Sequence, residues 1–279
     1  MKARLGSLFQ TNAHSLPRRL YFWWLQRWRG VFAKRQRVYF VRLGGKRFKR
    51  VVFGDSAQAA EVQAALDAFA GHGRFPPLVH RHENELLLAF VEGRSFDPED
   101  STDRARLARF LAELWRRAPV EIARSDLPYD ARLQVDLDVL VTAGVLTVER
   151  ARALATRAET VAPDRLLLGY DYVDPVAKNF VIAGSAPSGS DGARLVAIDI
   201  ESLRADQPLG AGLAQASLRW LAPGDVPVMA SQVTESGGPD IDAQLDYVRL
   251  ITTVAWTKRK LLQGKTRFIR SAHFDALLR

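Results

Sequence analysis

Two segments decide the fold of this chain: YVDPVAKNF at positions 172–180 and VAIDIE at positions 196–201. The first carries Asp174 five residues before Asn179, and the second brings Asp199 after a short apolar strand, a turn and another apolar strand. A loop carboxylate can take the proton of an attacking hydroxyl, while an amide oxygen and a second carboxylate are ligands that Mg²⁺ accepts. Because a transferred phosphoryl group carries its charge on outer oxygens, its chemistry needs mainly positioning and charge neutralisation. The two segments therefore predict a phosphoryl-transfer site.

These segments resemble the kinase-like superfamily. YVDPVAKNF is similar to the protein-kinase pattern H-R-D-L-x-x-x-N, and the Ile-Asp-x-Glu form of AIDIE looks most like the aminoglycoside phosphotransferase and choline kinase branch. Lipopolysaccharide-core sugar kinases are a further group that the chain resembles. The resemblance implies that Asp174 is the catalytic base and that Asn179 and Asp199 are metal ligands. It also implies that Glu201 is a supporting acid at the metal, and that the cofactors are ATP and Mg²⁺.

The chain departs from the kinase pattern at three places. Tyr172 stands where a His often precedes the catalytic Asp, and Val176 stands where protein kinases carry Lys and aminoglycoside kinases usually His. The third departure is extra length between the two segments, which falls in GSAPSGSDG at 184–192 and has the composition of an exposed hairpin turn. An insertion there should displace neither loop. The alternative interpretation is two buried strands flanked by turn residues that happen to be Asp and Asn.

Composition bounds the other possibilities. A chain of 279 residues that is 47% apolar can bury a sizeable core in one large or two modest domains. The absence of cysteine excludes disulfides, thiolate metal sites and a cysteine nucleophile. The net charge of +9 favours an anionic partner, such as a nucleotide, a phosphorylated glycan, an anionic lipid or nucleic acid. No stretch reaches about twenty uncharged apolar residues, so a membrane span is not expected.

The basic excess is concentrated near the start of the chain, where no acidic residue precedes Asp55. Within residues 20–32, aromatic side chains lie among arginines, as in an interfacial membrane helix. The aromatic residues are Tyr21, Phe22, Trp23, Trp24 and Trp28, and the arginines around them are Arg18, Arg19, Arg27 and Arg29. The alternative is that residues 21–28 pack on the neighbouring domain as an ordinary amphipathic helix.

The order of elements predicts an α+β chain with a two-lobed protein-kinase-like fold. Apolar alternation predicts strands at 37–43, 46–53, 77–82 and 85–91, and a helix at 57–70 capped by Asp55 or Ser56. VEGRSF at 91–96 resembles the hinge of sugar and choline kinases. Helical patterns then follow at 103–117, 131–143, 147–161, 210–221 and 241–262. We therefore expect a basic aromatic segment at 1–30, a small antiparallel β lobe at 31–96 and a mainly helical catalytic lobe at 97–279.

A kinase also needs a cation on the third strand to hold the α and β phosphates, and an acid on the next helix to orient that cation. Four strand cations compete: Lys46, Arg47, Lys49 and Arg50. We favour Lys49, paired with Glu61 on the following helix, and take Arg50 as the runner-up. The alternative is that all four are solvated. The glycine pattern G-x-G-x-x-G is absent, so other side chains or backbone amides would have to cover the phosphates.

Two further groups of residues invite weaker interpretations. His80 and His82 lie on one face of a predicted strand, but no third zinc ligand is evident, so ordinary strand histidines are the preferred reading. A second basic cluster is a solvated helix face or a wider phosphate-binding surface. Its members are Lys258, Arg259, Lys260, Lys265, Arg267 and Arg270.

These observations predict an ATP- and Mg²⁺-dependent phosphotransferase acting on a hydroxyl of a small molecule or glycan. A membrane-associated sugar acceptor would explain the basic aromatic N-terminus, and would place the protein in the cytoplasm, peripheral on the inner face of the membrane. Aminoglycosides are polycations and suit so basic a chain poorly. Nucleic acid is not expected, because no compact recognition motif is present. The competing class is a catalytically inactive kinase-like module that binds a membrane or another anionic partner.

The active-site prediction has a geometric form. Asp174, Asn179 and Asp199 should converge at the cleft between the two expected lobes. The oxygens of the last two should share a metal at roughly 2.0 to 2.6 Å per bond once nucleotide is bound.

Deleting residues 1–30 should release the protein from anionic vesicles, and added salt should weaken binding of the intact protein. The reason is that aromatic burial and about 1 kcal/mol per basic residue act together at such a surface. Vesicle sedimentation measures both effects. If the tryptophans are instead buried against the protein, the deletion should cause unfolding and the intact chain should not bind vesicles.

Overall fold

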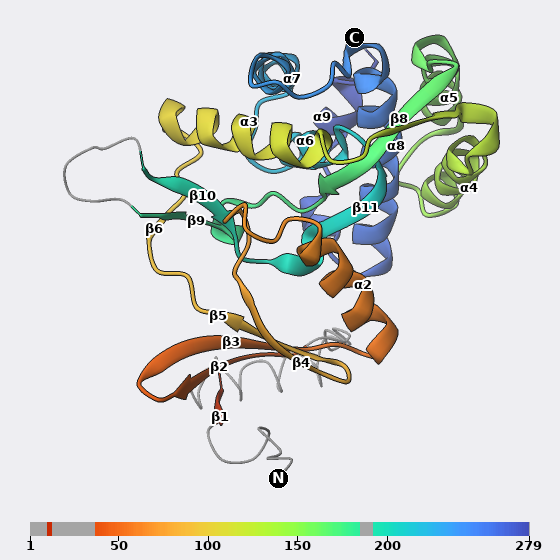
Figure 1. Cartoon of the computed structure of the whole chain (residues 1–279). Helices are drawn as coiled ribbons and strands as arrows, with labels where there is room; N and C mark the ends of the chain where they lie inside the picture. Colours follow the sequence, from red (N-terminus) through yellow and green to blue (C-terminus); the bar gives the residue numbers. More distant parts are fainter. Residues whose placement is uncertain (1–9, 13–36, 185–191, 279) are drawn as a thin grey trace. The chain divides into compact units, whose positions relative to one another are not determined.

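The computed structural model describes residues 10–12, 37–184 and 192–278. The segment 20–32 predicted to be interfacial lies outside these residues, as does most of the predicted hairpin turn. The chain is a mixed α and β protein that divides into two compact units. The first contains the residues up to 94 together with 181–200, and the second contains 95–180 and 201–279 (Figure 1). The domain limits expected at residues 30 and 96 stay a prediction.

The first unit is built on an antiparallel five-stranded sheet in the order β1-β2-β3-β5-β4. Its strands are β1 (Gln10–Asn12), β2 (Arg37–Leu43), β3 (Lys46–Val52), β4 (Leu78–His82) and β5 (Glu85–Ala89). The β2–β3 turn is made by Gly44 and Gly45, both in the left-handed region with φ of 53° and 78°. Leu86 and Leu88 alternate inward on β5 and are fully buried. The sheet thus has one apolar face.

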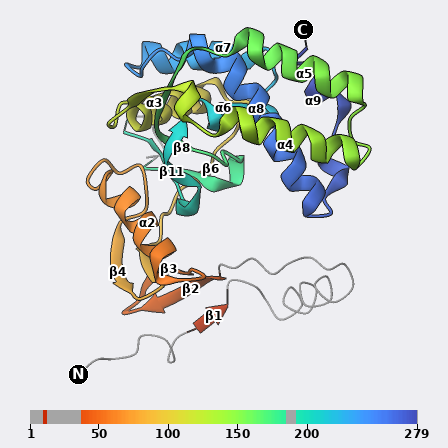
Figure 2. The same cartoon turned by 90° about the vertical axis from the view of Figure 1, so that its right-hand side faces the viewer.

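Helix α2 (Ser56–Asp67) packs against β5. It begins where Asp55 accepts a hydrogen bond from the backbone N–H of Gln58 at 2.7 Å, as an N-cap residue does. Its buried residues are Ala59, Val62, Ala65 and Leu66. Figure 2 shows α2 beside the strands of this sheet. The predicted strand–turn–strand–helix order is confirmed.

A second sheet, in the order β10-β9-β6, joins β6 (Arg94–Ser95), β9 (Phe180–Ala183) and β10 (Arg194–Ala197). Strands β9 and β10 flank the predicted hairpin turn. Gly93 precedes β6 and lies so close to β9 that a Cβ atom there would stand 2.2 Å from the carbonyl oxygen of Ile182. Because only glycine permits this approach, the segment VEGRSF is fixed against the strand that leaves the Asn179 loop.

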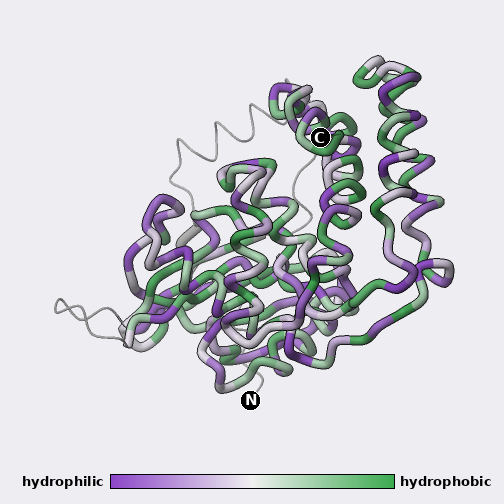
Figure 3. Tube along the Cα trace, turned by 90° about the horizontal axis from the view of Figure 1, so that it is seen from above, coloured by the Kyte–Doolittle hydropathy of each residue, from purple (hydrophilic) through white to green (hydrophobic). Residues whose placement is uncertain are grey.

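The second unit combines a small antiparallel sheet with seven of the described α-helices. The sheet has the order β11-β8-β7, with β7 (Val120–Ala123), β8 (Arg165–Tyr172) and β11 (Leu203–Pro208). The helices are α3 (Ser101–Trp115), α4 (Tyr129–Thr142), α5 (Val148–Val161), α6 (Ala211–Ser217), α7 (Asp225–Glu235), α8 (Asp242–Leu262) and α9 (Ser271–Asp275). The long helix α8 packs against α4, α5 and α6. Figure 3 shows hydrophobic and hydrophilic residues alternating around the helices, as expected when one face is buried.

The sequence patterns located most of these helices within a few residues, but they missed α7 and the short helix α9. Pro227 and the nearby Pro223 and Gly224 resemble a loop signal. Pro227 nevertheless stands at the third position of α7, in the first turn, where a backbone N–H has no partner inside the helix. The proline therefore costs α7 no hydrogen bond.

A buried carboxylate connects three elements of the second unit. Asp171, near the end of β8, accepts hydrogen bonds from Trp115 Nε1 of α3 at 3.2 Å, from the backbone N–H of Tyr172 at 2.7 Å and from that of Gly212 in α6 at 2.9 Å. Burial raises the pKa of the Asp171 carboxyl, and these N–H donors act in the opposite direction. A Cβ at Gly212 would stand 2.5 Å from the carbonyl oxygen of Tyr172, so the helix can reach β8 only with glycine there.

Asp171→Asn should lower the stability of the second unit by about 2 to 4 kcal/mol, because an amide nitrogen would face buried N–H donors and leave one unpaired. Thermal unfolding measures the loss. The matched control is Asp138→Asn on the exposed face of α4, which should change stability by less than about 0.5 kcal/mol. Equal effects of the two variants would contradict the role of Asp171.

Candidate active site

The loop that follows β8 holds Asp174 and Asn179 together. The side-chain amide of Asn179 donates a hydrogen bond to the backbone oxygen of Asp174 at 2.9 Å. The backbone N–H of Val176 donates to the same oxygen at 2.8 Å, and that of Asn179 donates to the oxygen of Val176 at 2.8 Å. Val173 is tied to Ser202 by a backbone hydrogen bond of 2.8 Å. The loop is therefore a compact, internally bonded turn.

An aromatic layer supports this loop. Tyr172 and Phe180, which flank it, are buried with ring centroids 5.1 Å apart. Phe110 of α3 contacts both rings edge-on at 5.8 Å. Phe96 adds a further contact to Phe180 at 5.6 Å. Tyr172, at the position where kinases often carry His, thus serves here as a packed core residue.

The Asp174 carboxylate faces a cation that sequence reasoning missed. Arg219, just after α6, lies 2.7 Å from Asp174 Oδ1. That oxygen is buried and accepts no well-aligned hydrogen bond from the described residues. Trp220 Nε1 donates to the backbone oxygen of Pro175 at 2.7 Å, so two consecutive residues hold the loop. No sequence signal points to Arg219, because it lies 45 positions from Asp174 with no motif around it.

In the first unit, Lys49 reaches the segment that carries Asp199. Its Nζ donates a hydrogen bond to the carbonyl oxygen of Ile198 at 2.6 Å. The other three candidate cations of this strand make different contacts. Arg50 Nε binds Glu85 at 2.8 Å, Arg47 pairs with Glu92 and lies over the Phe90 ring, and Lys46 is exposed. Lys49 of β3 is therefore the strand cation that contacts the segment before Asp199, and its role as the phosphate-binding cation stays a prediction.

The remaining predicted residues take the following places. Glu61 lies on α2, Asp199 follows β10, and Glu201 lies in the 3₁₀ turn Ile200–Ser202. Asp174, Asn179 and Glu201 belong to the second unit, whereas Lys49, Glu61 and Asp199 belong to the first. The convergence of Asp174, Asn179 and Asp199 therefore stays a prediction. The Lys49–Glu61 pair, within the first unit, stays a prediction as well.

The residues predicted to bind the metal carry the kind of donor atom that Mg²⁺ prefers. The amide nitrogen of Asn179 is directed at the backbone, so its oxygen is the atom that would bind a cation. Asn179, Asp199 and Glu201 offer only hard oxygen ligands, which Mg²⁺ prefers. Within residues 10–12, 37–184 and 192–278, no three His, Asp or Glu side chains gather as a metal site, so His80 and His82 gain no third ligand. No helix in that part of the chain is long and apolar enough to cross a membrane.

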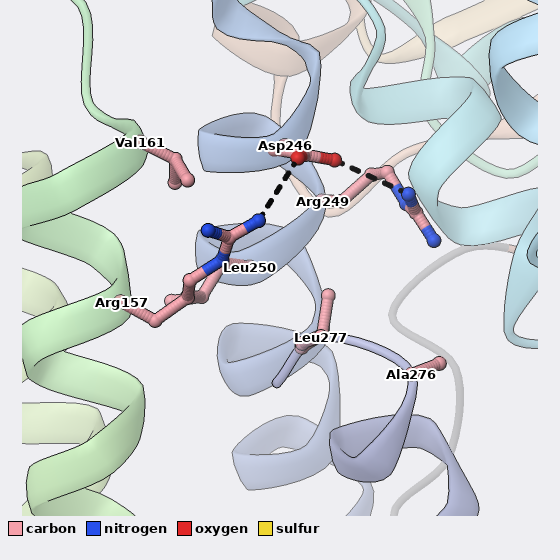
Figure 4. A pocket seen from close by; sticks show the side chains of 7 residues that line it. All are labelled: Arg157, Val161, Asp246, Arg249, Leu250, Ala276 and Leu277. Atoms are coloured by element: carbon pink, nitrogen blue, oxygen red, sulfur yellow. Dashed lines mark hydrogen bonds and ion pairs between the residues drawn. The ribbon is translucent and has the colours of Figure 1, made fainter. Parts of the chain in front are cut away.

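A pocket of about 220 Å³ opens elsewhere in the second unit, between α5, α8 and the residues after α9 (Figure 4). Arg157 and Arg249 each lie 3.3 Å from Asp246, one from either side. Leu250 and Leu277 add apolar walls. None of the predicted site residues lines this pocket, so it is not the candidate active site.

Comparisons with known proteins identify the fold through structure alone. No family model matches the chain, and no curated protein matches it significantly in sequence. Several solved structures match the chain in fold. Choline kinase LicA from Streptococcus pneumoniae is 14% identical, with a TM-score of 0.60 over 94% of this chain and 99% of its own. A macrolide 2'-phosphotransferase type I is 13% identical, with a TM-score of 0.58 over 96% of this chain and 99% of its own.

A third match is the aminoglycoside phosphotransferase APH(4)-Ia in complex with ADP and hygromycin B, at 12% identity and a TM-score of 0.58. It covers 88% of this chain and 91% of its own. The resemblance expected from YVDPVAKNF and AIDIE is confirmed at the level of the fold. The chain has a protein-kinase-like fold, similar to that of this choline kinase and this aminoglycoside phosphotransferase.

Proposed function

We propose that this protein is an ATP- and Mg²⁺-dependent phosphotransferase that phosphorylates a hydroxyl of a small molecule or glycan. The observation that carries the proposal is the Asp174 loop, a bonded turn presenting a carboxylate and an amide in a chain with the fold of small-molecule phosphotransferases. In the first unit, the hydrogen bond from Lys49 to the carbonyl oxygen of Ile198, the residue before Asp199, also supports the proposal. Structures of similar fold that contain ADP or AMP-PNP support nucleotide as the phosphoryl donor.

In this proposal each predicted site residue has its own role in the reaction. Asp174 takes the proton of the acceptor hydroxyl, whose oxygen bonds to the γ-phosphorus as the bond to the β-phosphate oxygen breaks and ADP leaves. Lys49, oriented by Glu61, would bind the phosphates. Mg²⁺, held by Asn179, Asp199 and Glu201, would neutralise the charge of the transferred group. Arg219 would hold the Asp174 carboxylate in place through its ion pair at 2.7 Å.

We also propose that the acceptor is membrane-associated and that the protein acts at the cytoplasmic face of the membrane. The basis is the basic aromatic segment 20–32. A second candidate is an inactive kinase-like binding module. The absence of G-x-G-x-x-G and the ion pair between Asp174 and Arg219 favour it. Nucleotide binding and turnover separate the two candidates.

ATP with Mg²⁺ should raise the thermal unfolding temperature of the full chain more than either does alone, because the predicted oxygen ligands would hold a metal that neutralises the phosphate charge. Asp174→Asn should keep this shift and lower ADP release about 10² to 10⁴-fold, because it removes only the base. Asp246→Asn, which also breaks surface ion pairs of the second unit, should leave turnover unchanged. Equal turnover by wild type and Asp174→Asn would refute the assigned base.

Lys49→Ala should weaken ATP binding by about 10- to 100-fold, because it removes a charge-assisted bond to phosphate. Lys46→Ala is the matched control, since it deletes the same side chain from an exposed position of the same strand. Calorimetric titration with ATP and Mg²⁺ compares them. If both variants bind ATP like the wild type, the phosphate-binding cation lies elsewhere.

A further inference from the structure

The Asp174 loop faces an excess of positive charge within its own unit. The cationic cluster consists of Arg219, Arg259, Lys260 and Lys265. Arg219 forms an ion pair with Asp174, and Arg259 and Lys260 each interact with it electrostatically. Lys260 is also within range of Lys265. In the part of the chain that the structure describes, these four cations form no ion pair with any other carboxylate. The Asp174 carboxylate is therefore the counter-ion of several cations.

Neutral groups position the cations of α8. Arg259 Nη2 donates to Gln215 Oε1 of α6 at 3.1 Å, and Gln215 is buried. Lys260 Nζ lies 5.2 Å from the centroid of the Trp256 ring and 5.9 Å from that of Phe268. Lys258, by contrast, pairs with Asp136 of α4. The basic cluster seen in the sequence thus divides into a neutralised part and a part directed at the loop.

This arrangement is unfavourable in the free protein. Burial, together with repulsion from Arg219, Arg259 and Lys265, lowers the pKa of Lys260 to about 8, while Asp174 acts in the opposite direction. The end of α8 does favour cations through the helix dipole. The dipole of α8 does not explain why Arg219, which is not on α8, lies beside these cations. Charges kept close together at a cost are typical of binding sites.

Polar atoms without partners lie beside the same cations. Trp256 Nε1 and His273 Nδ1 are buried and form no hydrogen bond with the described residues, and the two rings are in edge contact at 5.8 Å. Phe268, next to Lys260 and Arg267, leaves 43% of its surface exposed. An exposed ring beside cations suits a sugar that carries an acidic group.

We infer that the acceptor carries a negative charge, a phosphate or carboxylate near the hydroxyl to be phosphorylated, and that Arg259 and Lys260 bind this group. The inference rests on the proposed function, because it takes Asp174 as the base that faces the acceptor. It sets this chain apart from structural neighbours named for choline or an aminoglycoside, which are cations. Cations around the base would repel such substrates and attract an acidic sugar.

The test is calorimetric titration of the full chain with glucose 6-phosphate, glucuronate, glucose and choline, with and without ADP and Mg²⁺. The two acidic sugars should bind at least about tenfold more tightly than glucose, and choline should not bind. Arg259→Gln and Lys260→Gln should each weaken glucose 6-phosphate binding by about tenfold. Arg152→Gln, which removes the same charge from an exposed position of α5, should leave it unchanged.

The inference is overturned if glucose or choline binds as tightly as the acidic sugars, if no acidic sugar binds, or if Arg152→Gln weakens binding as much as Lys260→Gln. Its failure is distinguishable from failure of the proposed function. The thermal shift with ATP and Mg²⁺ reports nucleotide binding independently. A chain that binds acidic sugars but no nucleotide would refute the phosphotransferase and leave only an anion-binding site at Arg259 and Lys260.

Discussion

The second unit depends on the hydrogen bonds of Asp171. A carboxylate without solvent exposure is tolerated only when donors surround it, and here they come from α3, from β8 and from the start of α6. Three residues later the chain reaches Asp174. The loop that carries the candidate base therefore begins at a strand end that these hydrogen bonds hold. Gly212 is part of the same constraint, because the helix must approach the backbone of Tyr172.

The parts of the fold that sequence predicted are those encoded locally. The strands 37–43 and 46–53 were located because glycines mark the turn between them, and α2 because Asp55 caps it. The Asp174 loop was recognisable because its chemistry requires fixed residue types at short spacing. Helix α7 was missed because its proline resembles a breaker, although in the first turn it breaks nothing.

What sequence could not supply was long-range pairing. Arg219 and Asp174 are far apart in the chain, and nothing in their neighbourhoods links them before the fold is known. The basic residues near the end of α8 looked alike in the sequence, yet Lys258 meets a carboxylate while Arg259 meets an amide. Charge patterns identify a basic surface, but only packing decides which cations are neutralised.

The discontinuity of the first unit has a consequence for synthesis. Its β6, β9 and β10 sheet needs residues 181–200, which follow residue 94 by about a hundred positions. At roughly 5 to 20 residues per second, the early part of the unit waits on the order of 5 to 20 seconds for them on the ribosome. Until then Gly93 has no strand to approach and the backbone oxygen of Arg74 lacks its partner at Ala197. The N-terminal part of this protein therefore completes its folding only after much of the helical unit has been made.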